Sequence, residues 1–415
     1  MDIKEIINKK ALNKKLTQGE IEYFIKGYCS GEITDYQASA LLMAIKINGM
    51  TEKETFDLTH AMLNSGEIIN LEELGFCVDK HSTGGVSDTT TLALIPICAC
   101  LGVKMLKISG RSLGFTGGTA DKMESFDGFN AELDIEMAKK LVAKNGACII
   151  TSSPSISPAD KKLYALRDAT ATTESIPLIA SSIMSKKLAS GANAIVLDVK
   201  YGNGAFMKTK KDAKELASLM VKIGKVFGKK MDYILSDMNE PLGNNVGCKL
   251  EAYEAIELLS GKVGKLRDLT LTLASKCVAF GLNISESDAL KMATQALDSG
   301  IALEKFKQIV KAQGGSLKLF KGLGLKPKCQ VYSNQHGTLG KINCEKLGLL
   351  VGELGASRNK LGNSIDYNVG ITTFHKIGDK VNVGDLLFNV YAEDKQTANS
   401  YTQQLINCYL LEQSN

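Results

Sequence analysis

Residues 79–88 read DKHSTGGVSD, and residues 107–121 read KISGRSLGFTGGTAD. Each segment combines glycines with hydroxyl side chains and a lysine or an arginine. Glycine lets backbone N–H groups come close to a ligand, hydroxyls donate hydrogen bonds, and the cation neutralises negative charge. Two such loops in one compact domain predict a phosphate group that is held from two sides.

The sequence around these loops alternates apolar runs with amphipathic stretches. Strands are predicted over 92–100, 103–108, 147–150 and 194–199, and helices over 135–144 and 212–227. Strands that alternate with helices indicate a mostly parallel α/β sheet. Because the glycine-rich loops follow strands, we expect the ligand at the carboxyl ends of that sheet.

The N-terminal segment has helical spacing and no strand signal. Capping boxes, which start helices, occur at Thr17…Glu20, Thr34…Gln37 and Thr51…Glu54. Gly66 is expected to close the last of these helices. The segment 159–191 is also helical in pattern, and it is expected to pack on the N-terminal helices.

These patterns predict an α/β protein with two lobes and a third domain. Residues 1–66 form an all-α lobe that the insert 159–191 joins, and residues 67–158 and 192–325 form a mostly parallel α/β lobe that binds phosphate. After residue 325, glycines separate short β-like pieces. Residues 326–415 are therefore predicted to form a β-rich α+β C-terminal domain.

Composition and charge exclude several classes of function. The chain has 415 residues and a formal net charge of +5 with scattered Lys and Arg residues, so no nucleic acid partner is expected. The N-terminus is charged where a signal peptide needs an apolar run, and no apolar run is long enough to span a bilayer. We therefore expect a cytoplasmic protein with no membrane partner.

The spacing of the cysteines and histidines, and the lack of common nucleotide-binding motifs in the sequence, restrict the metals and cofactors that are expected. Ten cysteines without a C-x-x-C pair and four histidines without ligand spacing predict free thiols and no zinc site. The chain has no Walker-type loop and no G-x-G-x-x-G after a strand, which argues against an NTPase and a nicotinamide enzyme. No organic cofactor is expected.

Three charged side chains are candidates for chemistry. His81 lies between Lys80 and Ser82 in the first loop, which favours a functional role over that of an ordinary core or surface histidine. Arg167 and Lys186 lie in the helical insert with Ser182 between them. Taken alone, a helical arginine and lysine are more often solvated than functional.

The ordered motifs of the chain resemble those of the thymidine and pyrimidine-nucleoside phosphorylases. The matching segments are 80–86 (KHSTGGV), 108–111 (ISGR), 116–119 (TGGT), 159–167, 175–187, 194–200 (AIVLDVK) and 204–207 (GAFM). The resemblance covers essentially the whole chain, including the C-terminal domain. It implies a glycosyltransferase of nucleotide salvage that phosphorolyses thymidine, uridine and deoxyuridine to free base and α-(deoxy)ribose 1-phosphate.

The resemblance also implies roles for individual residues. Inorganic phosphate would be bound by Lys80, Ser82, Thr91, Ser109 and Thr119. The pyrimidine nucleoside would be bound by Arg167, Ser182 and Lys186, with apolar walls formed by Leu113, Ile179 and Phe206. The catalytic residues would be His81, Arg167 and Lys186. A structural potassium ion would be held, mostly through backbone carbonyls, by Ser87, Thr89, Leu242, Asn245 and Glu254. The family further implies a homodimer built on the all-α lobe.

The chain departs from the family pattern in several loops. The departures are Ser87 and Ser112 for Gly, Phe115 for His, Thr151-Ser152 for Gly-Gln, and Tyr201 and Asn203 for smaller residues. Two alternative functions stay open at this point. One is a relative of the anthranilate phosphoribosyltransferases, for which Asp88 and Asp121 are candidate magnesium ligands. The other is a non-catalytic binding relative.

Overall fold

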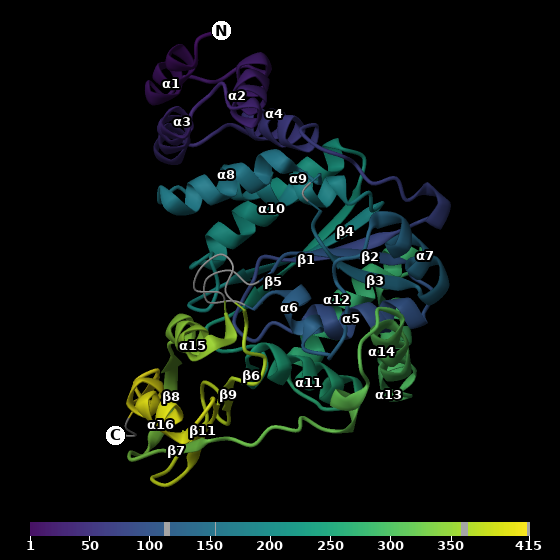
Figure 1. The fold of residues 1–415 in the computed structure, drawn as a ribbon, viewed down its shortest axis with the longest axis vertical. Helices are drawn as coiled ribbons and strands as arrows, with labels where there is room; N and C mark the ends of the chain where they lie inside the picture. The colour runs from purple at the N-terminus through teal and green to yellow at the C-terminus, as the bar shows by residue number, and fades with distance from the viewer. Residues whose placement is uncertain (112–116, 154, 358–363, 413–415) are drawn as a thin grey trace. The chain divides into compact units, whose positions relative to one another are not determined.

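The computed structural model describes residues 1–111, 117–153, 155–357 and 364–412 (Figure 1). They divide into two compact units. The first unit consists of residues 1–81, 152–197 and 211–233, and the second consists of residues 82–151, 198–210 and 234–415. The chain therefore passes from the first unit to the second inside the first glycine-rich loop, after His81.

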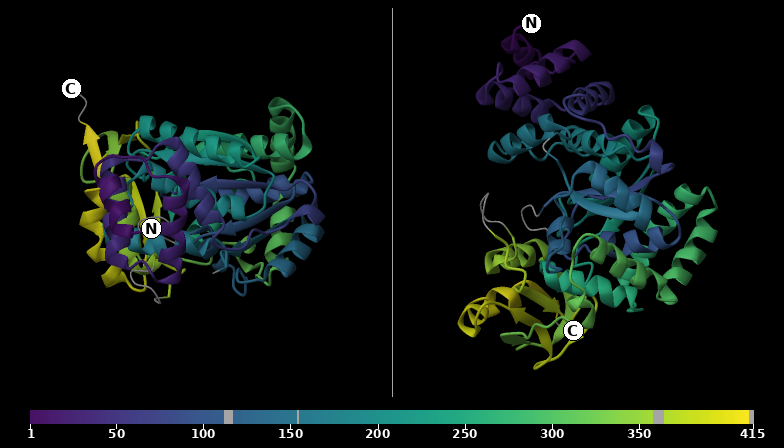
Figure 2. Two further views of the ribbon diagram at one scale, coloured as in Figure 1. Left: turned by 90° about the horizontal axis from the view of Figure 1, so that it is seen from above. Right: turned by 45° about the vertical axis from the view of Figure 1, so that its right-hand side comes forward.

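The N-terminal part of the first unit is a helical bundle. Its helices are α1 (Ile3–Ala11), α2 (Gln18–Ser30), α3 (Asp35–Asn48) and α4 (Glu52–Leu63). The three predicted capping boxes are confirmed at the starts of α2, α3 and α4. Figure 2 shows these helices, in purple, packed side by side. Each helix therefore begins where local sequence satisfies its first free N–H groups.

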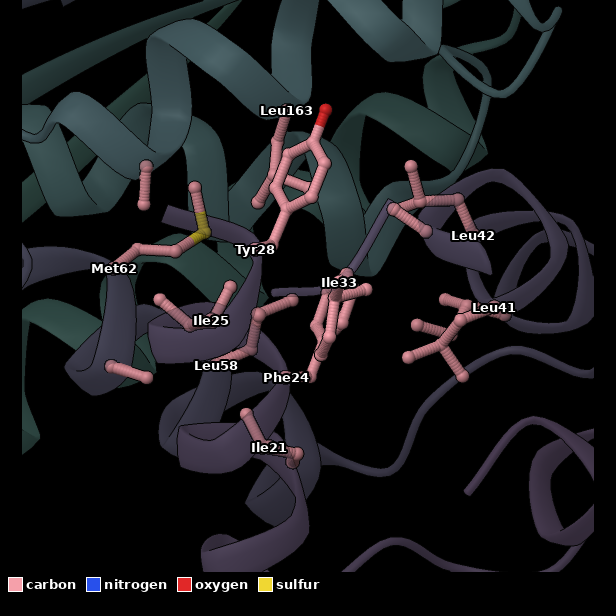
Figure 3. Packing of buried hydrophobic residues seen from close by; sticks show 14 of the residues in the cluster. Ile21, Phe24, Ile25, Tyr28, Ile33, Leu41, Leu42, Leu58, Met62 and Leu163 are labelled. Carbon is pink, nitrogen blue, oxygen red and sulfur yellow. The ribbon is translucent and has the colours of Figure 1, made fainter. Parts of the chain in front are cut away.

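Two further helices pack on this bundle. They are α8 (Pro158–Ala169) and α9 (Ile176–Ala189), both from the predicted insert. Leu163 and Leu178 belong to the same buried apolar cluster as Phe24, Leu42 and Leu58 (Figure 3). The helix α10 (Lys210–Val226) follows later in the chain. The exact domain boundaries proposed above stay a prediction.

The prediction that Gly66 closes the last helix is wrong. Helix α4 ends at Leu63, and Asn64 is its C-terminal cap. A Cβ on Gly66 would overlap the carbonyl oxygen of Ser155 and the ring of Pro158. The glycine is thus needed for a close approach of two chain segments in the first unit and not for a helix end.

Five strands form the sheets that carry the glycine-rich loops. The strands β1 (Val78–Ser82), β4 (Ala194–Tyr201) and β5 (Lys230–Asp237) make one sheet in the order β1-β4-β5. The strands β2 (Met105–Ser109) and β3 (Ala147–Thr151) pair in parallel, with Met105 opposite Ala147. The first glycine-rich loop follows β1 and the second follows β2, as predicted.

The prediction of a strand over 92–100 is wrong. These residues belong to α5 (Thr90–Cys100), and every residue of that helix from Thr90 to Ala99 is buried. A helix that is apolar on all sides has no polar face, so it reads in sequence like a buried strand. The tertiary structure, which buries this segment on all sides, shows that it is a helix and not a strand.

The remaining helices of the second unit surround α5 or lie beside the sheets. They are α6 (Thr119–Glu124), α7 (Ile135–Asn145), α11 (Cys248–Leu259), α12 (Lys265–Leu282), α13 (Glu286–Asp298) and α14 (Ile301–Ala312). Short 3₁₀ turns occur at Glu72–Leu74 and Lys318–Lys321. The helices α12 and α14 both pack against α5.

The C-terminal part of the second unit is rich in strands, which confirms the predicted fold class. One sheet has the order β6-β9-β11-β7 and another the order β10-β8-β12. Their strands are β6 (Asn245–Val246), β7 (Cys329–Tyr332), β8 (Gly337–Ile342), β9 (Gly370–Thr373), β10 (Lys380–Val381), β11 (Leu386–Tyr391) and β12 (Tyr409–Glu412). The helices there are α15 (Cys344–Val351), the π-helical turn Gly352–Ala356, α16 (Lys395–Ser400) and α17 (Thr402–Ile406). Because β6 pairs with β9, this part is joined to the loop before α11.

Candidate functional site

The first glycine-rich loop begins at the carboxyl end of β1. Lys80 lies in the strand and is fully buried, and Ser82 is its last residue. Thr83 follows, and its backbone N–H donates to the carbonyl of Asp198 at 3.1 Å. In return, its hydroxyl accepts from the backbone N–H of Lys200 at 2.9 Å. The loop is therefore attached to β4 on both sides of Asp198.

The second glycine-rich loop begins at the carboxyl end of β2. Ser109 is the last residue of that strand, and Thr119 is the first residue of α6, with Gly118 as the N-terminal cap. The free N–H groups of a helix start favour an anion there. Leu113 lies outside the described residues, as do Ser112 and Phe115.

A buried lysine joins the two loops. The Lys122 ammonium on α6 donates to the carbonyl oxygen of Asp88 in the first loop at 2.7 Å. It also lies 2.6 Å from a carboxylate oxygen of Glu251, and both side chains are almost completely buried. Since Thr119 is three residues before Lys122, this contact joins the start of α6 to the first loop at Asp88 within the second unit.

Arg167 lies on α8 in the first unit and is buried. Its three guanidinium nitrogens donate to the carbonyls of Thr172 (3.2 Å), Leu178 (3.1 Å) and Thr173 (2.8 Å). Burial lowers its pKa, and Asp160 opposes part of that shift. Among the described residues, these contacts use three of the five N–H groups of the guanidinium and leave two for a ligand.

Lys186 and Ser182 lie one turn apart on α9. The Lys186 ammonium donates to the Ser182 hydroxyl at 3.0 Å and forms an ion pair with Asp160 on α8. The other oxygen of Asp160 is buried and has no hydrogen-bond partner among the described residues. Lys186, Ser182 and Asp160 thus form a polar group in the first unit, next to Ile179, which is half-buried on the same helix.

The other predicted residues are distributed over the two units. His81 is half-buried at the end of the first segment of the first unit, and Thr91 is buried in the first turn of α5 in the second unit. Phe206 is 42% exposed in the second unit. Of the departures, Asn203 accepts from the backbone N–H of Glu345 at 3.2 Å, which fastens the loop before Phe206 to α15.

The five predicted potassium residues include buried oxygens that lack partners. The hydroxyls of Ser87 and Thr89 are buried without a hydrogen-bond partner among the described residues. Glu254 is also buried; it accepts from the backbone N–H groups of Asn244 (2.7 Å) and Asn245 (3.2 Å), and burial raises its pKa. A Cβ on Gly243 would overlap both Glu254 Oε2 and Ser87 Oγ, so these oxygens converge on one glycine.

Ser87 occupies this region at a conformational cost. Its φ is +60°, in the left-handed region that favours glycine, and a non-glycine residue there costs roughly 1–2 kcal/mol.

The Lys376 ammonium, from the C-terminal part of the second unit, donates to the carbonyls of Pro241 (2.5 Å) and Gly243 (2.7 Å). No group of three or more His, Cys, Asp or Glu side chains suitable for a metal occurs in the part of the chain that the structure describes. A cation would therefore depend mainly on carbonyl and hydroxyl oxygens.

Several polar residues near the predicted site were not identified from the sequence. Lys122, Asp160 and Lys200 are buried and make the contacts that orient the residues predicted to bind ligand. Asp160 and Arg167 are seven residues apart and therefore share a helix face, and this spacing could have identified Asp160 from the sequence. Lys200 lies in an otherwise apolar strand, and a buried lysine needs a partner, so its presence there was a second signal.

Three family models match the chain. The helical bundle domain of a glycosyl transferase family matches residues 4–66, and the a/b domain of the same family matches residues 74–303. The pyrimidine nucleoside phosphorylase C-terminal domain matches residues 338–412. The matches follow the order of helical bundle, α/β part and strand-rich part seen in the structure.

Individual proteins are similar over nearly the whole chain. A pyrimidine-nucleoside phosphorylase of Staphylococcus haemolyticus is 47% identical over 399 residues, which is 94% of this chain and 92% of that protein. The pyrimidine-nucleoside phosphorylase of Bacillus subtilis is 48% identical over the same shares of the two chains. Among solved structures, an anthranilate phosphoribosyltransferase of Thermus thermophilus has a TM-score of 0.62 at 18% identity, covering 75% of this chain and 99% of its own. That likeness concerns the fold alone.

Proposed function

This chain belongs to the pyrimidine-nucleoside phosphorylase family and is a pentosyltransferase, and from that premise we propose that it transfers the sugar of thymidine, uridine or deoxyuridine to inorganic phosphate. The products are the free base and α-(deoxy)ribose 1-phosphate. The observation that carries the proposal is the contact of Lys122 with Asp88, which joins two glycine and hydroxyl loops at the ends of strands.

The proposed phosphate ligands are Lys80, Ser82, Thr91, Ser109 and Thr119. Lysine neutralises the anion, and hydroxyls with backbone N–H groups fix its oxygens. The backbone N–H groups that are left free at the start of α6 can donate to the same anion. A phosphate fixed in this way is ready for attack, and holding two reactants in line is worth roughly 7–11 kcal/mol in good intramolecular systems.

The proposed base ligands are Arg167, Ser182 and Lys186, with His81 near O2 and the sugar. A phosphate oxygen forms a bond to C1′ while the C1′–N1 bond breaks, and the electron pair of that bond stays on the pyrimidine. The sugar becomes oxocarbenium-like and negative charge grows on the carbonyl oxygens of the base. Cationic side chains aimed at those oxygens stabilise the charge as it develops. No covalent intermediate is required, and attack on the face opposite the base inverts the anomeric centre.

The two alternatives receive less support. A magnesium–pyrophosphate site would need free carboxylates near the loops. Instead, Asp88 accepts hydrogen bonds from Ser82 and Thr90, and Asp121 forms an ion pair with Arg111 at 3.2 Å. A non-catalytic relative would be expected to have lost a phosphate or base ligand, but each proposed ligand residue is present in the sequence.

Release of free base from a panel of nucleosides tests the proposed function. We expect base release from thymidine and uridine only when phosphate is added, with sugar 1-phosphate formed in equal amount. Cytidine and purine nucleosides should be poor substrates, because a site built from buried polar groups rejects a ligand that leaves them unpaired. Release of base without phosphate, or equal rates for cytidine and uridine, would contradict the proposal.

We also propose that potassium binds among Ser87, Thr89, Leu242, Asn245 and Glu254. The buried Ser87 and Thr89 hydroxyls, which have no hydrogen-bond partner in the described part of the chain, and the buried Glu254 carboxylate support this assignment. Bound potassium would supply positive charge beside that carboxylate and connect the first loop to α11. A ligand that binds only the folded protein raises its stability by mass action.

Replacing Glu254 should remove the stabilising effect of potassium. We expect the melting temperature of Glu254→Gln to be almost the same in potassium and in tetramethylammonium buffers, whereas the unchanged protein melts several degrees higher in potassium, since ~1 kcal/mol shifts Tm by roughly 2–4 °C in proteins of 150–250 residues. Glu304→Gln is the matched control, because Glu304 is an exposed glutamate on α14 that pairs with Lys307 and not with Glu254 or its partners. Equal cation effects in all three proteins would argue against the ion.

The proposal extends to assembly and location. Tyr36, Met43 and Ile47 are exposed by 75%, 37% and 73% and lie on one face of α3, which supports a homodimer built on the helical bundle. Sedimentation equilibrium measures the oligomeric state directly, and a monomer at micromolar concentration would contradict the proposed homodimer.

The ten free cysteines suit a cytoplasmic location. No helix in the described ranges is long and apolar enough to cross a membrane.

A further inference from the structure

The Ser82 hydroxyl donates its single proton to another residue of the protein and not to a ligand. It donates to Asp88 Oδ2 at 2.5 Å, and it accepts from the backbone N–H of Gly84 at 3.2 Å. A carboxylate only accepts and an amide N–H only donates, so the direction of both hydrogen bonds is determined. A hydroxyl has one proton and two lone pairs, and Ser82 therefore has a single lone pair left for a ligand. Toward the proposed phosphate site it is an acceptor and not a donor.

The carboxylate that holds this proton is itself fixed. The other oxygen of Asp88 accepts from the hydroxyl of Thr90 at 2.6 Å and from its backbone N–H at 3.2 Å. The Lys200 ammonium lies 3.5 Å from Asp88 Oδ2, and Lys122 holds the carbonyl of the same residue. With these contacts on both oxygens and on the backbone, Asp88 cannot turn away to release the Ser82 proton.

The Lys200 ammonium beside Asp88 is held by residues of β4 and β5. Lys200 is fully buried, and its ammonium lies 3.0 Å from Asp198 and 3.2 Å from the hydroxyl of Ser236. The Ser236 hydroxyl donates to the other oxygen of Asp198 at 2.5 Å. Burial lowers the pKa of Lys200, but Asp198 and Asp88 raise it by more, so the ammonium stays charged. A charged Lys200 in turn favours the ionised, proton-accepting form of Asp88.

We propose that the Ser82–Asp88 pair recognises the P–OH group of inorganic phosphate and thereby selects phosphate against sulfate. The proposal rests on the proposed function, because it takes Ser82 as a phosphate ligand. Near neutral pH inorganic phosphate carries at least one proton, which can be donated to the free lone pair of Ser82. Sulfate has the same shape and charge as hydrogen phosphate but carries no proton, so its oxygen would face that lone pair. Asp88 acts through Ser82 and is a positioning residue.

Selectivity is expected because sulfate would place an oxygen against the Ser82 lone pair where phosphate donates a hydrogen bond. A site built to pair with a substrate O–H rejects an analogue that lacks it, by factors of about 10⁴–10⁵ in favourable cases. Because Ser82 is half-buried, a smaller ratio of at least about 100-fold is expected here. Arsenate also keeps a proton at neutral pH and should bind like phosphate.

The test measures two anions on the full-length enzyme at one pH and constant ionic strength. The KM for phosphate and the competitive inhibition constant for sulfate are determined with a saturating nucleoside. In Asp88→Asn the amide N–H₂ can donate to Ser82, which frees the serine proton for the anion. Sulfate should then inhibit more strongly than in the unchanged enzyme while phosphate binds more weakly, and the ratio should fall at least tenfold. A purely structural defect would weaken both anions alike.

Two further variants complete the test. Ser82→Ala removes the acceptor without altering Asp88, so the ratio should also fall, and this variant serves if Asp88→Asn does not fold. Asp385→Asn is the matched control, because Asp385 caps an exposed turn in the C-terminal part by accepting from Asn382 at 2.7 Å; it should keep the original ratio. An unchanged ratio in Ser82→Ala, or equal binding of the two anions by the unchanged enzyme, overturns the proposal. If base release needs no phosphate at all, the proposed function itself fails.

Discussion

Lys186→Met is expected to lower kcat for thymidine by about 10²–10³, the usual loss when one group that stabilises a developing negative charge is removed. The Lys186 ammonium is held by Asp160 and by the Ser182 hydroxyl, so its position is set before the nucleoside binds. Negative charge appears on the base mainly in the transition state. The loss should therefore fall on kcat more than on KM. Steady-state kinetics with thymidine at saturating phosphate measures both constants.

Two controls separate this effect from damage to the fold. Removing the lysine charge leaves Asp160 buried without its ion pair, and such a change alone destabilises a protein. Lys186→Gln keeps a donor for Asp160, so it should fold normally and still lose most of kcat. Lys161→Met, at an exposed position of α8, should change neither constant. A change confined to KM in both Lys186 variants would show that the lysine binds the nucleoside without stabilising the leaving base.

Lys80→Met should raise the KM for phosphate and reduce kcat/KM for phosphate by roughly 10–150-fold. A hydrogen bond to a charged group contributes about 1.5–3 kcal/mol, and every ~1.4 kcal/mol corresponds to a factor of ten. Methionine retains most of the volume of this fully buried side chain, so the change tests charge and not packing. The measurement is a phosphate titration at saturating thymidine.

The matched control is another buried lysine of the first unit. The Lys10 ammonium lies 2.8 Å from Glu54, and both side chains are almost completely buried. Lys10→Met should lower the melting temperature, since breaking a buried ion pair costs about 3–5 kcal/mol, but the KM for phosphate should not change. If Lys80→Met also lowers only the melting temperature, Lys80 is not a phosphate ligand.

Local sequence rules predicted much of this protein because the interactions they describe are local. The capping boxes at Thr17, Thr34 and Thr51 each join residues three positions apart, and each starts a helix in the structure. The two glycine-rich loops follow β1 and β2, and the C-terminal part is rich in strands, as the patterns indicated. The family resemblance also came from ordered motifs that can be read without a structure, and the relatives at 47–48% identity agree with it.

Tertiary structure alone decided the features that depend on distant residues. The run 92–100 is a helix because its surroundings bury every side, and no periodicity within the run could reveal that. Lys122 reaches Asp88 across 34 residues, and Ser236 reaches Asp198 across 38. The sequence by itself predicted a set of phosphate ligands, and these stay a prediction. Only the tertiary structure showed that Ser82 donates its proton to Asp88 and that the packing of β4 and α6 places Lys200 and Lys122 beside that residue, because hydrogen-bond direction depends on which partners folding brings within reach.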